Sequence, residues 1–325
     1  MMLVGTVGNI LTIIVIPKCA SLSSKPMSVY LVALAFVDTL ILDFGLLDFI
    51  LYVKGIELRG QHVVTCKLVG FFIYFLAQVS AWILASMSIE RFTAVFFPLK
   101  AKVMFTRRRA LWTLVFTTSA VVIFQSVHIW GRSLQTFISN ATHNENMTIY
   151  LYCGPKEQYH HYLVAVMPWL EFTFTSALPF VIMLVTSIAI VRQIIVRNKQ
   201  RKYQQRHLSS RSINVTKTTR VLLALCFTFL ALGGPLAILC AIVNGVSEGT
   251  IAMSESVYQK FLNAFYLSNF IFYLNYVANF YLYCLTSKPF RKELLKLLGL
   301  EQWFSERGRT RLPGKHSSET HITRC

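Results

Sequence analysis

The sequence predicts an all-α membrane protein, a bundle of seven transmembrane helices followed by a short amphipathic eighth helix. Of the 325 residues, 54% are hydrophobic and only 14% are charged, unlike the composition of a soluble domain. Seven mainly apolar segments approach the roughly 20 residues that cross a bilayer, and each must be helical because backbone groups in lipid need internal partners. We place these segments at 1–17, 27–53, 66–97, 109–131, 162–196, 215–244 and 260–286.

The first segment begins at Met1 and offers only 17 residues, the lower limit for a crossing helix. We therefore expect the N-terminus to be truncated or wrongly assigned. A cleaved signal peptide is a weaker interpretation, since no basic leader precedes the apolar run. Residues 1–300 should form a single seven-transmembrane domain, and the polar residues 301–325 should form a disordered tail.

Positive charge alternates between the loops of this arrangement. The formal net charge is +18, and 25 of the 32 Lys and Arg residues fall on one side when the loops are assigned alternately. By the positive-inside rule that side is cytoplasmic, which places the N-terminus outside and the C-terminus inside. The charge thus reports topology and contact with anionic lipid, and gives no reason to expect nucleic-acid binding.

Cysteines and glycosylation sequons agree with this topology. Cys66 opens the third segment on the outer side, and Cys153 lies in the outer loop after the fourth segment, where disulfides persist, so we pair them. Sequons at Asn140 and Asn146 lie in the same outer loop and predict glycosylation. The sequon at Asn214 falls inside and should be unused.

Short motifs follow one another along the segments in a fixed order. They are Gly8-Asn9, Leu34-Ala35-Phe36-Val37-Asp38, Cys66, Glu90-Arg91-Phe92, Pro98-Leu99, Pro179, Phe229 with Pro235, Asn279 to Tyr283, and Phe290-Arg291. The series resembles the rhodopsin-like, or class A, family of G-protein-coupled receptors over residues 8 to about 298. The resemblance implies a receptor that binds an extracellular ligand and activates heterotrimeric G proteins.

Asp38 is an acid in mid-span, which by itself marks a functional site or an ion partner. With Asn9, Ser80, Asn275 and Asn279 it would form a cluster of oxygen ligands suited to a hard monovalent cation and water. The family resemblance implies an allosteric sodium ion here, which favours the inactive state. The alternative is a hydrogen-bonded packing cluster without an ion, and we expect no other cofactor or metal.

Arg91 is the expected switch. The resemblance implies that this arginine pairs at rest with the acid beside it, here Glu90. It also implies that Arg91 helps to form the G-protein site when the sixth span moves outward. The expected coupling residues are Glu90, Arg91, Phe92, Pro98, Leu99 and Tyr283.

Ligand-independent signalling follows from the inner end of the sixth segment. Residues 211–220 contain no acid, so Arg91 finds no partner there that would restrain the sixth span. We expect basal signalling above that of empty-vector cells at matched surface expression. A basal level equal to theirs would contradict this expectation.

Gly233-Gly234-Pro235 marks the expected hinge of the sixth span, with Phe229 before it. Proline removes a helix hydrogen bond, and two glycines loosen the preceding turn. The family that the chain resembles usually has a tryptophan at the position of Gly233 and a proline at the position of Phe280. Because this chain departs from the family at both positions, ligand binding must reach the hinge through other side chains.

The outer halves of the spans argue against two classes of ligand. The resemblance aligns Ile73 with the aspartate of amine receptors and Tyr273 with the Schiff-base lysine of opsins. The partner for a small amine and the anchor for retinal are therefore both missing, which argues against an amine receptor and a photoreceptor.

Two acids stand at the outer end, Asp48 in the second span and Glu171 in the fifth. Helical periodicity puts Asp48 within about 80° of the face of Asp38, so it should look inward. Acids that line a partly buried opening attract a basic ligand, because the low-dielectric walls concentrate their electric field. The alternative is that the two carboxylates accept hydrogen bonds from nearby hydroxyl groups. The expected ligand-binding set is Asp48, Ile73, Tyr74, Glu171, Phe265, Asn269 and Tyr273.

The outer loop 132–161 favours a peptide ligand. Residues 148–153 are rich in β-formers and end at Gly154-Pro155, a turn signal, which predicts a β-hairpin lid tied down by the disulfide. Such hairpins are common in the peptide receptors of the family that the chain resembles. We expect an extracellular neuropeptide, amidated and carrying arginine, as in the Arg-Phe-amide type.

The segment after the seventh span predicts a helix on the inner leaflet. Residues 288–300 alternate basic and leucine positions at helical spacing. The tail beyond carries Ser317, Ser318, Thr320 and Thr323, whose phosphorylation would recruit arrestin. The expected partners are therefore a peptide, a G protein, arrestin and membrane lipid.

No enzyme motif accompanies these features. The chain contains no His-Glu-x-x-His, Cys-x-x-Cys, P-loop or Gly-x-Ser-x-Gly sequence, so we expect no catalysis. A transporter or channel would account for the mid-membrane acid, but such folds show internal repeats that are not visible here. A receptor-shaped protein that binds ligand without coupling is a third interpretation, favoured by Gly233 and Phe280.

Overall fold

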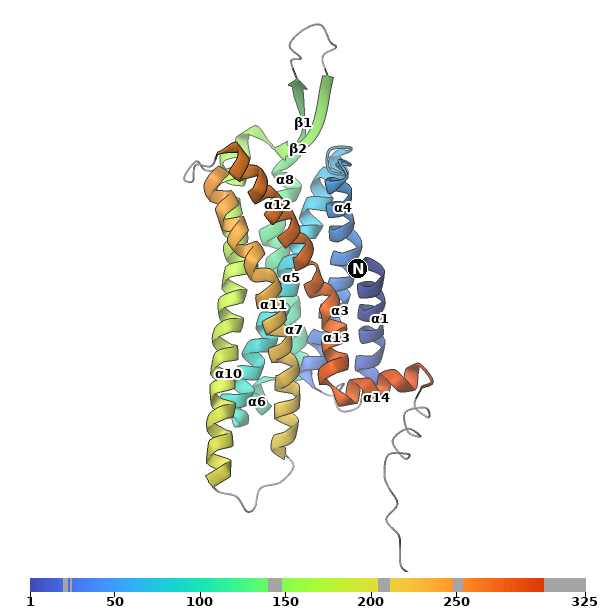
Figure 1. Cartoon of the computed structure of the whole chain (residues 1–325), viewed down its shortest axis with the longest axis vertical. Coiled ribbons are helices and arrows are strands. Elements are labelled where there is room, and N and C mark those ends of the chain that lie inside the picture. The colour runs from blue at the N-terminus through green and yellow to red at the C-terminus, as the bar shows by residue number, and fades with distance from the viewer. Residues whose placement is uncertain (20–22, 24, 140–147, 204–210, 248–253, 301–325) are drawn as a thin grey trace, which may run out of the picture.

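Seven helical passes run along the long axis of the molecule, with a β-hairpin at one end and the crosswise helix α14 at the other (Figure 1). The computed structural model describes residues 1–19, 23, 25–139, 148–203, 211–247 and 254–300. The passes are α1 (Met2–Lys18); α3 (Pro26–Leu40), η1 (Ile41–Leu46) and α4 (Leu47–Val53); α5 (Val63–Phe96); α7 (Arg107–Gln125) and α8 (Val127–Trp130); η3 (Tyr162–Val166), α9 (Met167–Glu171), η4 (Phe172–Ala177) and α10 (Leu178–Tyr203); α11 (Arg211–Ser247); and α12 (Glu255–Phe272) and α13 (Leu274–Thr286). The other elements are α6 (Pro98–Met104), β1 (Arg132–Ser139), β2 (Thr148–Pro155), the short helical turn η2 (Glu157–Tyr159) and α14 (Lys288–Leu297).

The seven predicted segments are confirmed as helical passes. Five stretches of the described chain are long and apolar enough to cross a membrane by themselves, at 26–53, 63–96, 107–130, 162–197 and 221–240. The first pass is apolar but shorter, and the seventh is interrupted at Tyr273, between α12 and α13. The fifth and sixth helices extend past the predicted segments, to Tyr203 and from Arg211.

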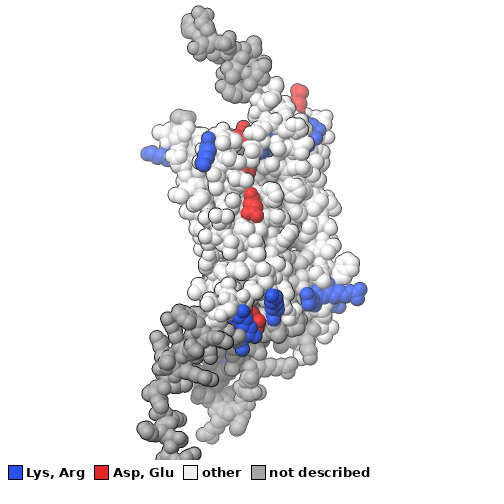
Figure 2. Space-filling model, turned by 90° about the vertical axis from the view of Figure 1, so that its right-hand side faces the viewer, with Lys and Arg blue, Asp and Glu red and all other residues white. Residues whose placement is uncertain are grey.

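The middle of the bundle presents an apolar surface. Figure 2 shows charged side chains gathered towards the two ends of one face, with a largely uncharged region between them. Large apolar side chains point outward from several passes, including Phe36 at 56%, Phe116 at 76% and Leu285 at 76% exposure. An apolar surface this extensive is expected to face another apolar phase rather than water. The architecture therefore fits a multi-pass membrane protein.

The second pass changes its winding between Asp38 and Asp48. The π-type turns of η1 separate α3 from α4, and such turns are frequent at functional sites. Asp38 and Asp48 are both buried, with 0% and 8% exposure, so the prediction that Asp48 looks inward is confirmed. Asp43 lies between them, half-buried, and accepts a hydrogen bond from Thr6 Oγ1 of α1 at 2.9 Å.

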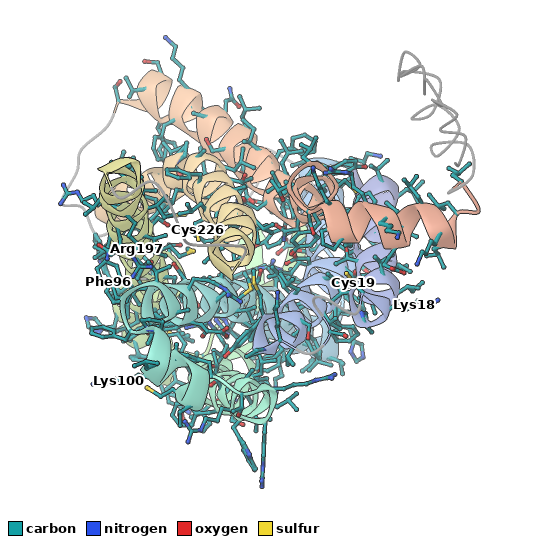
Figure 3. All side chains as sticks on the ribbon, turned by 90° about the horizontal axis from the view of Figure 1, so that it is seen from below. Lys18, Cys19, Phe96, Lys100, Arg197 and Cys226 are labelled. Carbon is teal, nitrogen blue, oxygen red and sulfur yellow. A yellow bond between two sulfur atoms is a disulfide. The ribbon has the colours of Figure 1, made fainter. Side chains whose placement is uncertain are left out.

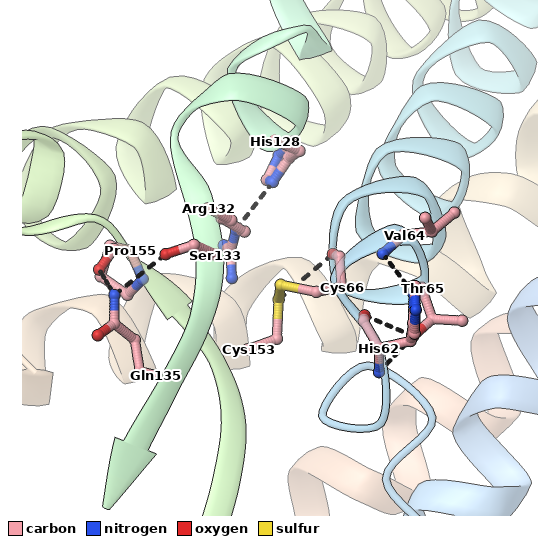
Figure 4. The surroundings of a disulfide bond; sticks show 10 residues. All are labelled: His62, Val64, Thr65, Cys66, His128, Arg132, Ser133, Gln135, Cys153 and Pro155. Carbon is pink, nitrogen blue, oxygen red and sulfur yellow. Dashed lines mark hydrogen bonds between the residues drawn. A yellow bond between two sulfur atoms is a disulfide. The ribbon is translucent and has the colours of Figure 1, made fainter.

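The hairpin is anchored by the predicted disulfide. Cys153 of β2 is bonded to Cys66 in the first turn of α5, with 5.3 Å between the Cα atoms. Figure 4 shows this bond, with β1 and β2 passing beside the end of α5. The disulfide thus joins the hairpin to the third pass.

The expected turn at Gly154-Pro155 is wrong. Both residues lie within β2, paired with Ser133 and Arg132 of β1, and the ladder runs from that pair to Ser139 opposite Thr148. Pro155 is compatible with its place because it stands at the end of the ladder, where a missing N–H costs little. The strands are joined by residues 140–147, so the sequons at Asn140 and Asn146 lie outside the described residues.

The predicted eighth helix is confirmed as α14, which ends at Leu297. Ser287 caps it by accepting a hydrogen bond from the Phe290 N–H at 3.4 Å. Phe290 is fully buried against the rings of Phe280 and Tyr283. Arg291 Nη1 donates to the last carbonyls of α13, which fixes the turn between the helices. The tail 301–325, with its serines and threonines, lies outside the described residues.

Candidate functional site

Three buried polar side chains meet in the middle of the bundle. Ser80 Oγ of α5 donates to Asp38 Oδ1 of α3 at 2.9 Å, and Asn279 Nδ2 of α13 donates to Asp38 Oδ2 at 2.6 Å. Asp38 is 0% exposed. One carboxylate therefore links three passes in a low-dielectric region, where hydrogen bonds are strong and unpaired groups are costly.

The two other members of the expected cluster make no hydrogen bond to Asp38 among the described residues. Asn9 Nδ2 donates to the Tyr276 carbonyl at 3.0 Å. Among the described residues, Asn9 Oδ1 and Asn275 Nδ2 are buried and have no hydrogen-bond partner. A buried oxygen without a donor can be satisfied by a cation or by water. The unpartnered Asn9 oxygen is compatible with a cation or a water molecule, and sodium at this cluster stays a prediction.

Arg91 lies half-buried at the end of the bundle that carries α14, called here the α14 end, with 12% of its side chain exposed. Its Nη2 is 3.4 Å from Glu90 Oε1 and 3.1 Å from Met27 Sδ. Within the described residues, Glu90 Oε2 and Arg91 Nε have no hydrogen-bond partner. Because charge-assisted hydrogen bonds are usually shorter, at about 2.7–2.9 Å, the Glu90–Arg91 pair is largely buried but poorly satisfied.

The other expected coupling residues make no hydrogen bond to this pair among the described residues. The Phe92 ring packs against Phe96 with ring centroids 4.5 Å apart. Pro98 begins α6, whose Leu99 is 84% exposed. The Tyr283 hydroxyl is buried and has no partner among the described residues.

Arg197 of α10 is a residue that the sequence reasoning missed. Its Nη2 donates to the Val95 carbonyl in the last turn of α5 at 2.7 Å. Figure 3 views the bundle from the α14 end and shows Arg197 beside Phe96 of α5. The third and fifth passes are thus tied together one turn beyond Arg91.

The first acid at the end that carries the hairpin, the hairpin end, has an internal counter-ion. Arg59 Nη2, in the loop before α5, bonds to Asp48 Oδ2 at 2.7 Å. Burial opposes the charge of Arg59, but Tyr74 and the Asp48 carboxylate outweigh it and raise the pKa of the guanidinium above its ordinary value. Arg59 therefore stays cationic and neutralises Asp48.

Glu171, the second acid, is also paired. Its Oε1 lies 2.7 Å from Nε2 of His128, at the end of the fourth pass. Arg132 Nε donates to His128 Nδ1 at 3.2 Å, a bond drawn in Figure 4. Because a guanidinium only donates, Nδ1 accepts and Nε2 carries the proton that Glu171 accepts. The result is a chain of three polar groups across two passes and the start of β1.

These pairs correct the picture of two free acids waiting for a basic ligand. Both carboxylates are bound by side chains of the same molecule, Asp48 by Arg59 and Glu171 by His128. The alternative that they satisfy nearby hydroxyls is not what the structure shows either. A ligand cation would have to displace an internal partner to reach either acid.

Two aromatic members of the expected set, Tyr74 and Tyr273, make ring contacts in this part of the bundle. The Tyr74 ring stacks on His128 with centroids 4.7 Å apart. Tyr273 is buried and packs on Phe49 of α4 at 5.9 Å. For Ile73, Phe265 and Asn269, no hydrogen bond or ring contact with either acid is present among the described residues, and their part in ligand binding stays a prediction.

Phe272 occupies space beside the expected hinge. The sixth helix continues through Pro235. A Cβ added at Gly233 would lie 3.2 Å from the Phe272 ring, which also packs edge-on against Phe229 at 6.2 Å. The seventh pass therefore fills the place that a large side chain at 233 would need. Phe272 thus contacts the sixth pass at the expected hinge.

Three partners at the hairpin end escaped the sequence reasoning: Arg59, His128 and Arg132. A signal existed for Arg59 and Arg132, which are the only arginines in the predicted outer loops. His128 stands in an apolar run, where a buried polar side chain needs a partner. None of these signals says which acid each residue meets.

The chain matches the sequence model of the rhodopsin family of 7 transmembrane receptors over residues 8–283. It is 26% identical to galanin receptor 2a of Danio rerio, over 91% of this chain and 75% of that protein. It is 28% identical to growth hormone secretagogue receptor type 1 of Homo sapiens, over 94% of this chain and 80% of that protein. With the neuromedin U receptor homolog nmur-2 of Caenorhabditis elegans the identity is 25%, over 91% and 76%. The family match covers most of the seven-pass bundle, and this chain belongs to the rhodopsin family of seven-transmembrane receptors.

Proposed function

We propose that this chain is a plasma-membrane receptor that binds an extracellular peptide and activates heterotrimeric G proteins. Membership of a receptor family supports signalling rather than catalysis. The observation that carries the peptide is the set of similar proteins, named as receptors for galanin, growth hormone secretagogues and neuromedin U and matched over 91–94% of this chain. These belong to the peptide receptors of the family.

The hairpin supports a peptide ligand. β1 and β2 form a two-stranded sheet held to α5 by the Cys66–Cys153 bond. Strand edges offer backbone donors and acceptors, which an extended peptide can pair with. A hairpin fixed in this way forms one wall of a peptide site at the hairpin end.

The charge distribution supports one orientation. The side rich in Lys and Arg holds 25 of the 32 such residues, and we place it, with the α14 end, in the cytoplasm. The hairpin end and the N-terminus then lie outside. α14 would lie on the inner leaflet against anionic lipid, and the tail beyond it would bind arrestin when phosphorylated.

Coupling is proposed at the α14 end. The Glu90–Arg91 contact at 3.4 Å is long for a buried ion pair, so little free energy opposes its opening. An outward movement of the sixth pass would expose Arg91 to the G protein, and exposed Leu99 on α6 would add an apolar contact.

Sodium at Asp38 is a further part of the proposal. We expect NaCl, compared with KCl, to stabilise the purified receptor and to lower its basal signalling, because the ion binds the resting state. At ten times the dissociation constant the stabilisation is about 1.4 kcal/mol. Asp38→Asn should remove the difference between the salts. The control is Asp43→Asn, which changes another acid of the same pass. Among the described residues the Asp43 side chain bonds only to Thr6, so this variant should keep the difference between the salts. Equal behaviour of the wild type in both salts would contradict the sodium site.

A second-messenger screen tests the proposed function. Cells that display the full chain receive galanin, neuromedin U, a growth hormone secretagogue and a panel of amidated peptides, with amines and lipids as controls, while calcium and cyclic AMP are recorded. We expect a response to a peptide and none to amines. A response to an amine or lipid would overturn the peptide assignment. Peptide binding without any second messenger would favour the non-coupling receptor that Gly233 and Phe280 suggest.

A further inference from the structure

Two arginines at the hairpin end are each held in place by a buried partner. Arg59 is bound by Asp48 at 2.7 Å. Arg132 is bound by His128 at 3.2 Å, and His128 in turn contacts Glu171 at 2.7 Å. Each acid thus fixes one guanidinium, directly in the first case and through an imidazole in the second.

Both guanidiniums keep donors that are free to bind something else. Among the described residues, each of them makes one hydrogen bond as a donor, although a guanidinium carries several N–H groups. The Arg59 side chain is 29% exposed and that of Asp48 only 10%. The His128 side chain is 1% exposed. A molecule that arrives from the hairpin end therefore meets Arg59 before it meets the Asp48 carboxylate.

Tyr74 is the side chain with which both arginines interact electrostatically. Its ring stacks on His128 at 4.7 Å. Its hydroxyl lies within electrostatic range of both Arg59 and Arg132, and the residue is half-buried. Both guanidiniums therefore lie within electrostatic range of the Tyr74 hydroxyl, Arg132 through the His128 ring on which Tyr74 stacks.

We propose that Arg59 and Arg132, with the Tyr74 hydroxyl, bind a carboxylate of the peptide ligand. Planar guanidinium groups match a carboxylate geometrically, and charge-assisted bonds of this kind are the strong ones. The inference rests on the proposed function and specifies the ligand chemistry at its site. It reverses the earlier expectation, because Asp48 and Glu171 position the arginines and do not bind a ligand cation.

Three small probes of the same ring size test the inference on the purified full-chain receptor. They are N-acetyl-phenylalanine, which carries a carboxylate, its uncharged amide, and phenethylamine, which carries a cation. Thermal stability is titrated with each probe. We expect only the carboxylate to raise the midpoint, and we expect Arg59→Gln and Arg132→Gln each to raise its dissociation constant by about 10- to 100-fold, as for a lost hydrogen bond to a charged group.

Lys156→Gln is the matched control, since it removes one positive charge from a predicted outer loop without touching Tyr74; it should leave the titration unchanged. Arg59→Lys keeps the charge, so its intermediate affinity would separate recognition from a folding defect. Equal or absent effects of acid and amide would overturn the proposal. So would carboxylate binding that survives either glutamine variant, or phenethylamine binding that Arg59→Gln strengthens by freeing Asp48. Because no signalling is read, these outcomes are independent of whether the chain activates G proteins.

Discussion

In cells with equal amounts of receptor at the surface, Arg91→Ala is expected to abolish peptide-evoked G-protein activation while peptide binding persists. Arg91 lies near the α14 end of α5, and the disulfide at Cys66 lies at the opposite end of the same helix. The substitution should therefore leave the peptide site at the hairpin end unchanged. Second-messenger dose–response curves and binding of the same labelled peptide measure the two properties separately. An unchanged maximal response would contradict the assignment of Arg91.

Folding has to be separated from coupling in this experiment. Removal of Arg91 leaves Glu90 buried and unpaired, which can cost about 3–5 kcal/mol. The double variant Glu90→Gln/Arg91→Ala removes the stranded charge and should bind peptide normally without signalling. Arg107→Ala removes an exposed arginine at the same end, whose contact with the Ser23 carbonyl is long at 3.5 Å, and should signal like the wild type.

Loss of the disulfide is expected to destabilise the receptor and to weaken peptide binding. The bond closes a loop of 87 residues, and the chain-entropy estimate for such a loop is about 4–5 kcal/mol. Cys66→Ser, Cys153→Ser and the double variant should therefore lower the thermal midpoint to a similar degree. They should also speed peptide dissociation, because β2 is no longer held to α5.

Cys284→Ser is the control for this series. Cys284 is a free, half-buried cysteine of α13, so its substitution removes a thiol without opening a bridge. Thermal melting of the purified variants and washout of labelled peptide are the measurements. A double variant that is much less stable than either single one would show that the two cysteines act separately.

The passes and the disulfide were predictable because each depends on a local signal. An apolar run of sufficient length must be a helix in lipid, and the two cysteines on the outer side had each other as partners. Asp38 was predictable as a buried site for the same reason, since an acid in mid-span has few other places to go.

The break in the seventh pass was not predictable. α12 ends at Phe272 and α13 begins at Leu274, yet the segment has neither glycine nor proline to announce an interruption. The contacts of Phe272 with Phe229 and Gly233 come from another pass and have no mark in the local sequence.

The partners of the two outer acids could not be predicted from the sequence, for a related reason. Helical periodicity reports which way Asp48 faces, but the position of Arg59 depends on how the loop before α5 folds back. Glu171 and His128 lie 43 residues apart on two different passes. Gly154-Pro155 led to a wrong turn prediction, because the residue types that favour a turn are the same at the open end of a hairpin as in its connecting loop.

Peptide-stimulated nucleotide exchange tests the central claim most directly. Purified receptor, reconstituted in bilayers with a heterotrimeric G protein, is given the peptide found by the screen, and the rate of nucleotide exchange on the G protein is followed. The account predicts that peptide accelerates exchange on the wild type and not on Glu90→Gln/Arg91→Ala, although both bind the peptide. Binding without acceleration on the wild type, or equal acceleration on both, would contradict it.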